Sequence, residues 1–374
     1  MLFFGNKVKN MMQGRNIIKM VTIGRFMRSI ILAQLVLLAV WGCELRHLGA
    51  QSTSLCLPQH DVAPPSSYLR LVQNESVCVR PGDDVWWISS RNLHTELVSP
   101  NQLIAFRYAA LDGEQVHWQL AQANDFVIDH NDNSDRQTVF YVHGNRTNVE
   151  WSMRRGVQVY QGLYGNRDDA PPVRFVIWHW PADENYLRIQ EYEDNAMRAI
   201  IHGRHFSRFM HFLNPNHSFS FIGFSLGFQF VMSAAEQTAK FAGERNEQSQ
   251  AWCERGVHVV ALAPVVANDW SIQEGRIERA SQLVNKVIAF DNRSDLALKA
   301  FKLKSVADHY KCIDSSKIIS ILAQGGTTSE QIDVAEWIGR AHEIKKYVTS
   351  DVVSALIFES LDLGSPKEQP SSMK

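Results

Sequence analysis

The sequence has little net charge, few cysteines and no glycine-rich phosphate-binding loop. Its 374 residues carry a formal net charge of -1, and no basic stripe interleaved with aromatic residues occurs outside the N-terminus, which argues against nucleic-acid binding. The stretch GNRTNVEWSMRRG (144–156) lacks the glycine spacing of dinucleotide-binding and P-loop motifs, so we expect no nucleotide cofactor. The hydrophobic content of 45% is typical of a globular protein with a large core.

The spacing of cysteines and histidines does not predict a metal site either. His202, His205 and His211 have no carboxylate or further ligand at metal-site spacing, so we interpret them as a solvated or packing face. If Cys43 is removed during export, four cysteines remain, which suits an oxidising compartment. Their pairing and the presence of free thiols are left open. The five cysteines are Cys43, Cys56, Cys78, Cys253 and Cys312.

Residues 1–50 are typical of an export signal. Lysines and arginines precede the uncharged run SIILAQLVLLAVWG (29–42). This run is shorter than the about 20 apolar residues of a membrane-spanning helix, which favours a cleaved signal, ending at Ala50, over a retained anchor or a lipidated Cys43. We therefore expect an exported protein of bacterial type (periplasmic, secreted or anchored), with membrane association only through this segment.

The pattern of the chain changes near residue 132. Residues 51–131 contain turn formers and short strand-like runs, among them DVWWISSR and NQLIAFRYAAL, which predict a β-rich extension. Over residues 132–362, short apolar runs alternate with longer helical ones, as in a mostly parallel sheet with helices on both faces. Predicted strands include TVFYVHG, VRFVIWHWP, SFSFIGF, GVHVVALAPVV, NKVIAFDN and, as the last strand, HYKCID. The polar residues 363–374 are predicted to be disordered.

The stretch SFSFIGFSLGFQFVMSAAEQ (218–237) contains Gly-x-Ser-x-Gly between a predicted strand and a predicted helix. A serine at such a sharp turn projects its hydroxyl from the carboxyl end of the strand, where it can act as a nucleophile. Side chains at Gly223 and Gly227 would collide with neighbouring backbone. We therefore predict that Ser225 is a nucleophile and that the backbone N–H of Leu226 donates to an oxyanion.

A nucleophilic serine requires a base and an orienting carboxylate, which follow it in the order acid, then histidine, on this kind of sheet. Asp295 and Asp291 follow the predicted strand NKVIAFDN, and Asp269 follows an earlier one. All three remain candidates, since an acid after a strand is often a helix cap. His342 lies after the last predicted strand, on the side of the nucleophile, whereas His309 opens that strand at the opposite end.

The second oxyanion donor is expected on the loop after TVFYVHG. The N–H of Asn145, or of a neighbour, is available there. In this interpretation His143 supports the loop and is not the base. The alternative for His342 is a surface position on a helical segment, WIGRAHEIKKY (337–347).

As an ordered set, these segments resemble the bacterial α/β-hydrolase family of unassigned function. The segments are FYVHGNRTNVEWSMRRG, VIWHWP, FIGFSLGFQFV, VVALAPVV, FDNRSDLALKAF and AHEIKKYV, and the resemblance covers about residues 136–360. It implies an α/β-hydrolase fold with Ser225 as nucleophile, Asp295 as triad acid and His342 as base. No metal or organic cofactor is implied.

The chain departs from the family at four positions. Phe224 and Leu226 replace the usual histidine and small or methionine residue beside the nucleophile, Val265 replaces an acid, and Ala341 replaces a glycine. None of these changes removes a member of the triad. The bulky pair beside the serine is compatible with an apolar acyl pocket and equally with core packing.

Together these features predict an exported serine hydrolase that acts on a small-molecule or lipid-like carboxylic ester, or a related acyl substrate, through an acyl-enzyme. The alternative is a non-catalytic binding or surface protein on the same scaffold, because fold does not fix function. In that case the N-terminal segment with Trp86, Trp87 and Trp118 is either a recognition module or a set of strands added to the sheet edge.

Overall fold

The computed structural model describes residues 79–94, 96–111, 115–133, 136–183, 190–267, 275–303 and 315–361. Several predictions fall outside these ranges, namely those for the export segment, the polar tail, Asp269, His309 with the segment HYKCID, and every cysteine except Cys253. Within the described part of the chain, every helix is too short or too polar to cross a membrane.

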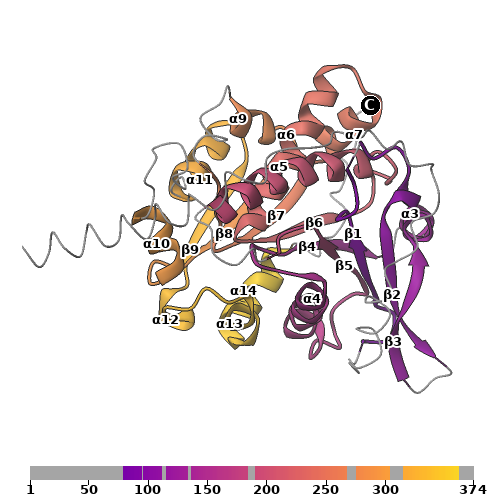
Figure 1. Cartoon of the computed structure of the whole chain (residues 1–374), viewed down its shortest axis with the longest axis horizontal. Coiled ribbons are helices and arrows are strands. Elements are labelled where there is room, and N and C mark those ends of the chain that lie inside the picture. Colours follow the sequence, from indigo (N-terminus) through magenta and orange to yellow (C-terminus); the bar gives the residue numbers. More distant parts are fainter. Residues whose placement is uncertain are drawn as a thin grey trace, which may run out of the picture. The chain divides into compact units, whose positions relative to one another are not determined.

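The strands of the described residues form one sheet of nine strands, in the spatial order β3-β2-β1-β5-β4-β6-β7-β8-β9 (Figure 1). From β1 to β9 along this order all neighbours are parallel, and β2 and β3 are antiparallel additions at one edge. The strands are β1 Asp84–Ser89, β2 Ile104–Leu111, β3 Gln115–Gln122, β4 Gln137–Val142, β5 Val173–His179, β6 Phe219–Phe224, β7 Val257–Leu262, β8 Val284–Asp291 and β9 Thr328–Asp333.

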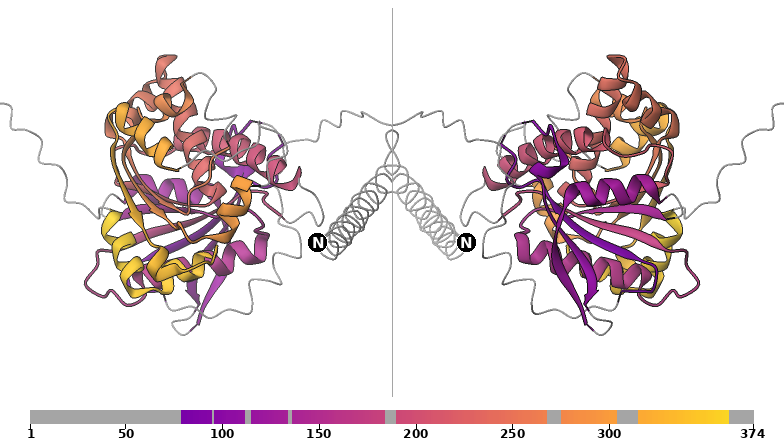
Figure 2. Two further views of the ribbon diagram at one scale, coloured as in Figure 1. Left: turned by 90° about the vertical axis from the view of Figure 1, so that its left-hand side faces the viewer. Right: turned by 90° about the vertical axis from the view of Figure 1, so that its right-hand side faces the viewer.

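Helices cover both faces of the sheet (Figure 2). The helices over one face are α3 Ala123–Asp132, α5 Gln190–Met210, α6 Leu226–Gly243, α7 Glu247–Arg255, α9 Arg276–Ala280 and α11 Ser315–Gln324. The helices over the other are α4 Val149–Tyr164, α12 Ala335–Ile338, α13 Ile344–Thr349 and α14 Asp351–Ser360. The described residues also contain the short helix α10 Leu296–Leu303 and the 3-10 helix η2 Pro100–Gln102.

Alternating side chains of each strand supply the two cores. In β4, Phe140 and Val142 belong to one hydrophobic cluster, while Val139 and Tyr141 belong to the other. Every residue of β4, β5 and β6 is buried, as a sheet covered on both faces requires. The predicted fold class is therefore confirmed.

The segment predicted as a β-rich extension supplies three strands of this same sheet. Trp86, Trp87 and Trp118 are all buried, so none is exposed for recognition. Strand β3 and helix α3 were not predicted.

The closing part of the sheet differs from the expectation. The last strand within the described residues is β9, whose sequence TSEQID is polar and mostly exposed. The segment 337–347 is not one helix, because α12 ends at Ile338, before Gly339, whose φ of 69° terminates it. Helix α5 is continuous from Gln190 to Met210, although it contains Gly203.

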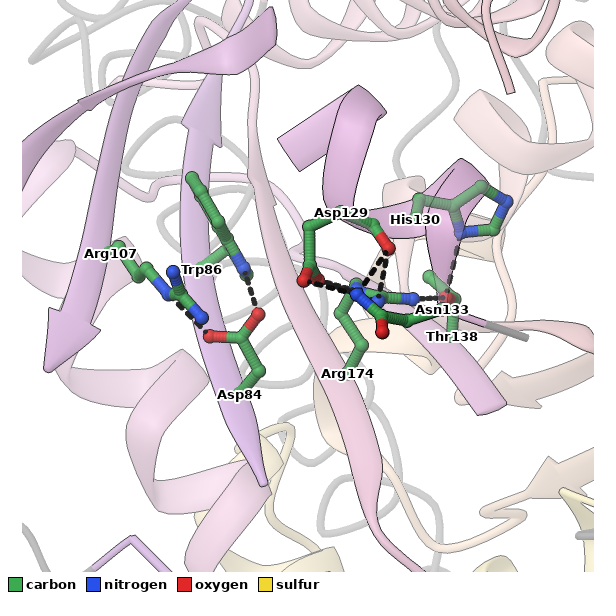
Figure 3. Close-up of polar contacts among 8 residues, drawn as sticks. All are labelled: Asp84, Trp86, Arg107, Asp129, His130, Asn133, Thr138 and Arg174. Carbon is green, nitrogen blue, oxygen red and sulfur yellow. Dashed lines mark hydrogen bonds and ion pairs between the residues drawn. The ribbon is translucent and has the colours of Figure 1, made fainter. Parts of the chain in front are cut away.

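A polar network lies at the amino ends of the parallel strands β1, β4 and β5 (Figure 3). The fully buried Arg174 of β5 donates to Asp129 of α3, at 2.6 and 2.8 Å, and to Thr138 of β4 at 3.2 Å. Asp84 of β1 accepts from Arg107 of β2 at 2.8 Å and stands beside Arg174 in the strand register. This network joins the N-terminal strands and α3 to the middle of the sheet.

His202, His205 and His211 are packing residues. His202 and His205 are buried rather than solvated, with ring centroids 5.3 Å apart, and His202 Nδ1 lies 3.0 Å from Ser90 Oγ. His211 Nε2 lies 2.8 Å from Ser249 Oγ. Among the described residues no group of three potential metal ligands is found. Cys253 is a partly buried free thiol.

Candidate active site

Ser225 sits on a strained turn between β6 and α6. Its φ of 53° and ψ of -122° lie in a region that L-residues rarely adopt, at a cost of about 1–3 kcal/mol. A Cβ at Gly223 would stand 2.9 Å from Phe228 Cα, and one at Gly227 would run into the carbonyl oxygen of Val142. A side chain at either glycine would therefore obstruct the close approach of strand and helix.

Ser225, His342 and Asp295 form one hydrogen-bonded chain. His342 Nε2 lies 3.0 Å from Ser225 Oγ, and His342 Nδ1 lies 2.6 Å from Asp295 Oδ2. With Asp295 ionised, Nδ1–H donates to the carboxylate and Nε2 is left to accept the serine proton. The three side chains follow the carboxyl ends of β6, β8 and β9, which are parallel and therefore meet at one edge of the sheet.

Asp295 is a helix cap and the partner of the histidine at the same time. Its Oδ1 accepts the N–H groups of Ala297 at 2.8 Å and Leu298 at 3.1 Å, in the first turn of α10. Its Oδ2 is thereby left to His342, and the carboxylate is fully buried. The capping interpretation and the triad interpretation are therefore not exclusive.

The alternative acid, Asp291, makes its hydrogen bonds to β9 and to the residue that follows it. Gln331 of β9 donates to its carboxylate, and its backbone oxygen accepts from Val334 N–H at 2.8 Å. Asp291 thus ties β8 to the edge strand, while the residue four positions later turns toward His342.

His342 lies on a loop between α12 and α13, not on a helix. Its side chain is 19% exposed, whereas that of Asp295 is fully buried. The Phe224 ring lies 5.1 Å from the imidazole, between centroids, and 6.1 Å from the Tyr347 ring. Phe224 is thus packed beneath the histidine, and Leu226 is fully buried in the opposite core, so both bulky neighbours of Ser225 act in core packing.

Two backbone N–H groups are available near Ser225 for an oxyanion. Among the backbone-to-backbone bonds of turns, loops and caps in the described residues, none is donated by the N–H of Leu226 or of Asn145. Leu226 opens α6, whose positive end adds to the field at the serine. The loop of Asn145 is close to the elbow, because a Cβ at Gly144 would stand 3.0 Å from Ser225 Cβ.

Contacts on both sides hold the Asn145 loop in place. The buried Asn195 of α5 donates to Asn145 Oδ1 at 2.6 Å. Arg146, at φ 54°, is paired with the buried Glu191 at 2.9 Å. Thr147 N–H donates to Ala182 O at 2.8 Å. The α5 contacts carry no motif in the sequence.

His143 supports this loop, and its hydrogen-bond partners are backbone groups of Gly144 and Trp180. Burial lowers the pKa of His143 to about 4, so its imidazole is neutral. Nε2 accepts Trp180 N–H at 3.3 Å, which leaves Nδ1–H to donate to Gly144 O at 2.9 Å. The Trp180 ring stacks on it at 5.5 Å.

Sequence patterns also missed Asn292, the first residue after β8. Its buried amide contacts the loop that carries His342. A single buried asparagine leaves no periodic or spacing signal, so the contact becomes visible only in three dimensions.

No family model and no curated protein matches the chain. Solved structures do match, among them an uncharacterized protein from Bacillus cereus ATCC 10987, with 13% identity and a TM-score of 0.30, where the match spans 54% of this chain and 52% of that one. Another is an esterase B from Lactobacillus rhamnosis inhibited by a tributyrin phosphonate, with 11% identity, a TM-score of 0.35, and 79% and 91% of the two chains covered. A thermostable esterase from Pseudomonas putida ECU1011 matches with 9% identity, a TM-score of 0.32, and 69% and 80% covered.

These identities and TM-scores are too low to transfer an activity, so the assignment rests on the sheet and the elbow. Parallel strands lead to a strained serine, and the acid and the histidine follow it in the chain order of that architecture. The described part of the chain has the α/β-hydrolase fold.

Proposed function

We propose that this protein is a serine hydrolase that cleaves a carboxylic ester or a related acyl bond. The observation that carries the proposal is the continuous chain from Ser225 Oγ to His342 to Asp295, with distances of 3.0 and 2.6 Å. A serine that only shapes a turn needs no imidazole at its hydroxyl and no buried carboxylate behind that imidazole.

The reaction follows from this arrangement. His342 Nε2 takes the proton of Ser225 as Oγ bonds to the carbonyl carbon, and the carbonyl oxygen becomes an oxyanion. The N–H groups of Leu226 and Asn145 stabilise that charge. The C–O bond to the alcohol then breaks, and His342 returns the proton to the leaving alcohol. Water, activated by the same imidazole, releases the acid from the serine.

Labelling with a fluorophosphonate tests the proposal. The parent protein is expected to form a covalent adduct at Ser225, located by mass spectrometry of the peptides, and to hydrolyse p-nitrophenyl acetate. Ser225→Ala should do neither. Asp291→Asn is a matched control, because that acid is bound to Gln331 rather than to the triad, and it should keep both reactions. An unlabelled parent, beside a control hydrolase that reacts, would favour the non-catalytic binding protein.

We further propose that the protein is exported and acts outside the cytoplasm. The proposal rests on the basic segment followed by the uncharged run at 29–42. Expression of the full chain in a bacterium, followed by fractionation and N-terminal sequencing, tests it. A protein that remains in the cytosol with its N-terminus intact would contradict export.

A further inference from the structure

We infer that Asn292 is a positioning residue that holds His342 and Asp295 at hydrogen-bonding distance from each other and His342 at hydrogen-bonding distance from Ser225. This inference rests on the proposed function. Asn292 directly follows β8 and is 3% exposed. Its side chain is placed between two loops that are distant in the sequence, the one that carries the acid and the one that carries the base. Because it reaches no substrate atom in the proposed reaction, it acts through His342.

On the acid side, Asn292 builds the turn that delivers Asp295. Its Oδ1 accepts the N–H of Ser294 at 3.0 Å, and its backbone oxygen accepts the N–H of Asp295 at 3.1 Å. These two bonds close a turn over residues 292–295, which ends where α10 begins.

The loop that carries His342 is held through three consecutive backbone carbonyls, which accept hydrogen bonds from the loop that carries Asp295. Asn292 Nδ2 donates to Gly339 O at 2.8 Å and to Ala341 O at 3.3 Å. The N–H of Leu296 donates to the carbonyl of Arg340, between them, at 3.3 Å. The residue that follows this clamped segment is His342.

The chemistry of the side chain explains why an amide is required. An amide supplies two N–H donors for two carbonyls and one oxygen for a backbone N–H. A carboxylate of the same shape has no donor and would face both carbonyls while adding charge beside Asp295. An apolar side chain would leave the two carbonyls and the Ser294 N–H unpaired.

The test compares Asn292→Ala with Asn285→Ala in the full chain. Asn285 lies at the other end of the same strand, and its Nδ2 donates to Arg255 O at 2.8 Å. Its loss therefore removes an amide-to-carbonyl bond of the same kind far from the site. One readout is the downfield proton NMR signal of the His342 Nδ1–H, identified by its loss in His342→Ala. The other is the pair kcat and KM for p-nitrophenyl acetate.

Asn292→Ala is expected to lose the Nδ1–H signal to solvent exchange. It should also lower kcat about tenfold to a hundredfold while KM changes less than twofold, since small misplacements of a reacting group have effects of this size. Asn285→Ala should change neither. If Asn292→Ala does not fold, Asn292→Ser is measured in the same way.

An Asn292 variant that is folded and keeps both the NMR signal and kcat overturns the positioning role. Equal losses in the Asn292 and Asn285 variants also overturn it, because they indicate general destabilisation of β8. A parent protein that shows the Nδ1–H signal but hydrolyses no ester and takes no fluorophosphonate refutes the proposed function instead. In that case the NMR comparison alone still decides whether Asn292 positions His342.

Discussion

The fold should lose stability steeply between pH 7.5 and pH 5.5, because it buries several histidines in the neutral form. Burial lowers the pKa of His130 to about 3, of His143 to about 4 and of His202 to about 3, and it holds that of His179 well below its ordinary range. At His130 the charge of the neighbouring Arg174 acts in the same direction (Figure 3).

The sign follows from proton binding. Below the ordinary histidine pKa of 6.5 the unfolded chain takes up protons that the folded chain refuses, so stability is present above that pH and is lost as the pH falls. At pH 5.5 each such histidine costs about 1.4 kcal/mol, since one pKa unit corresponds to about 1.36 kcal/mol. Four of them cost about 5–6 kcal/mol, which is comparable to the whole stability of a typical domain.

Urea unfolding of the full chain at a series of pH values measures this effect directly. The free energy of unfolding should fall by about 5–6 kcal/mol from pH 7.5 to pH 5.5. His130→Asn, which keeps a polar atom for Thr138, should remove about a quarter of that fall, and the exposed His94→Asn should leave it unchanged. The reasoning is refuted if stability is flat over this range, or if His130→Asn keeps the full dependence.

Three substitutions at the site follow from its geometry. Ser225→Gly should raise the free energy of unfolding by about 1–3 kcal/mol in urea, because glycine adopts φ 53° without strain, and it should abolish labelling; an unchanged stability would contradict the strain. Gly227→Ala should lower the free energy of unfolding by about 1–3 kcal/mol and slow fluorophosphonate labelling, because its Cβ meets the Val142 carbonyl. Labelling at the parent rate would show that strand β6 and helix α6 do not need this close approach. Asp295→Asn should lower kcat for p-nitrophenyl acetate about 10⁴-fold with little change in melting temperature, because an amide oxygen can still cap α10 while the imidazolium loses its carboxylate; a loss no larger than that of Asp291→Asn would remove Asp295 from the triad.

The parts of the fold that sequence predicts well are those where one physical requirement dominates. Strands β4, β6 and β8 are buried on both faces and therefore read as continuous apolar runs. The elbow is recognisable because sterics exclude side chains at Gly223 and Gly227. The chain order serine, acid, histidine, expected for this architecture, then limits the candidate partners of Ser225 to a few residues.

Some of the elements that the sequence analysis does not predict depend on contacts made across the chain, whereas others have a local sequence signal. Strand β9 is polar and lies at the edge, so hydrogen bonds to β8 define it rather than an apolar pattern. In β3, the apolar residues Val116, Trp118 and Leu120 alternate with other residues, a pattern that is typical of a strand. The break between α12 and α13 was signalled by Gly339, a residue that commonly ends helices.

The strained backbone of this protein is concentrated at the edge of the sheet that holds the proposed site. Four non-glycine residues within the described ranges have positive φ, and three of them, Arg146, Ser225 and Ala263, follow the carboxyl ends of β4, β6 and β7. Such conformations persist where surrounding contacts over-determine them. At Arg146 the buried Glu191 does so, and at Ser225 the backbone bond to Leu262 O, at 2.9 Å, does so. At the amino ends of the strands lies instead the ionic network of Arg174, Asp129 and Asp84, which joins β5 to α3 and β1 to β2. The ion pairs at the amino ends of the strands therefore stabilise the sheet, whereas the strained residues at the carboxyl ends include the turn that exposes Ser225.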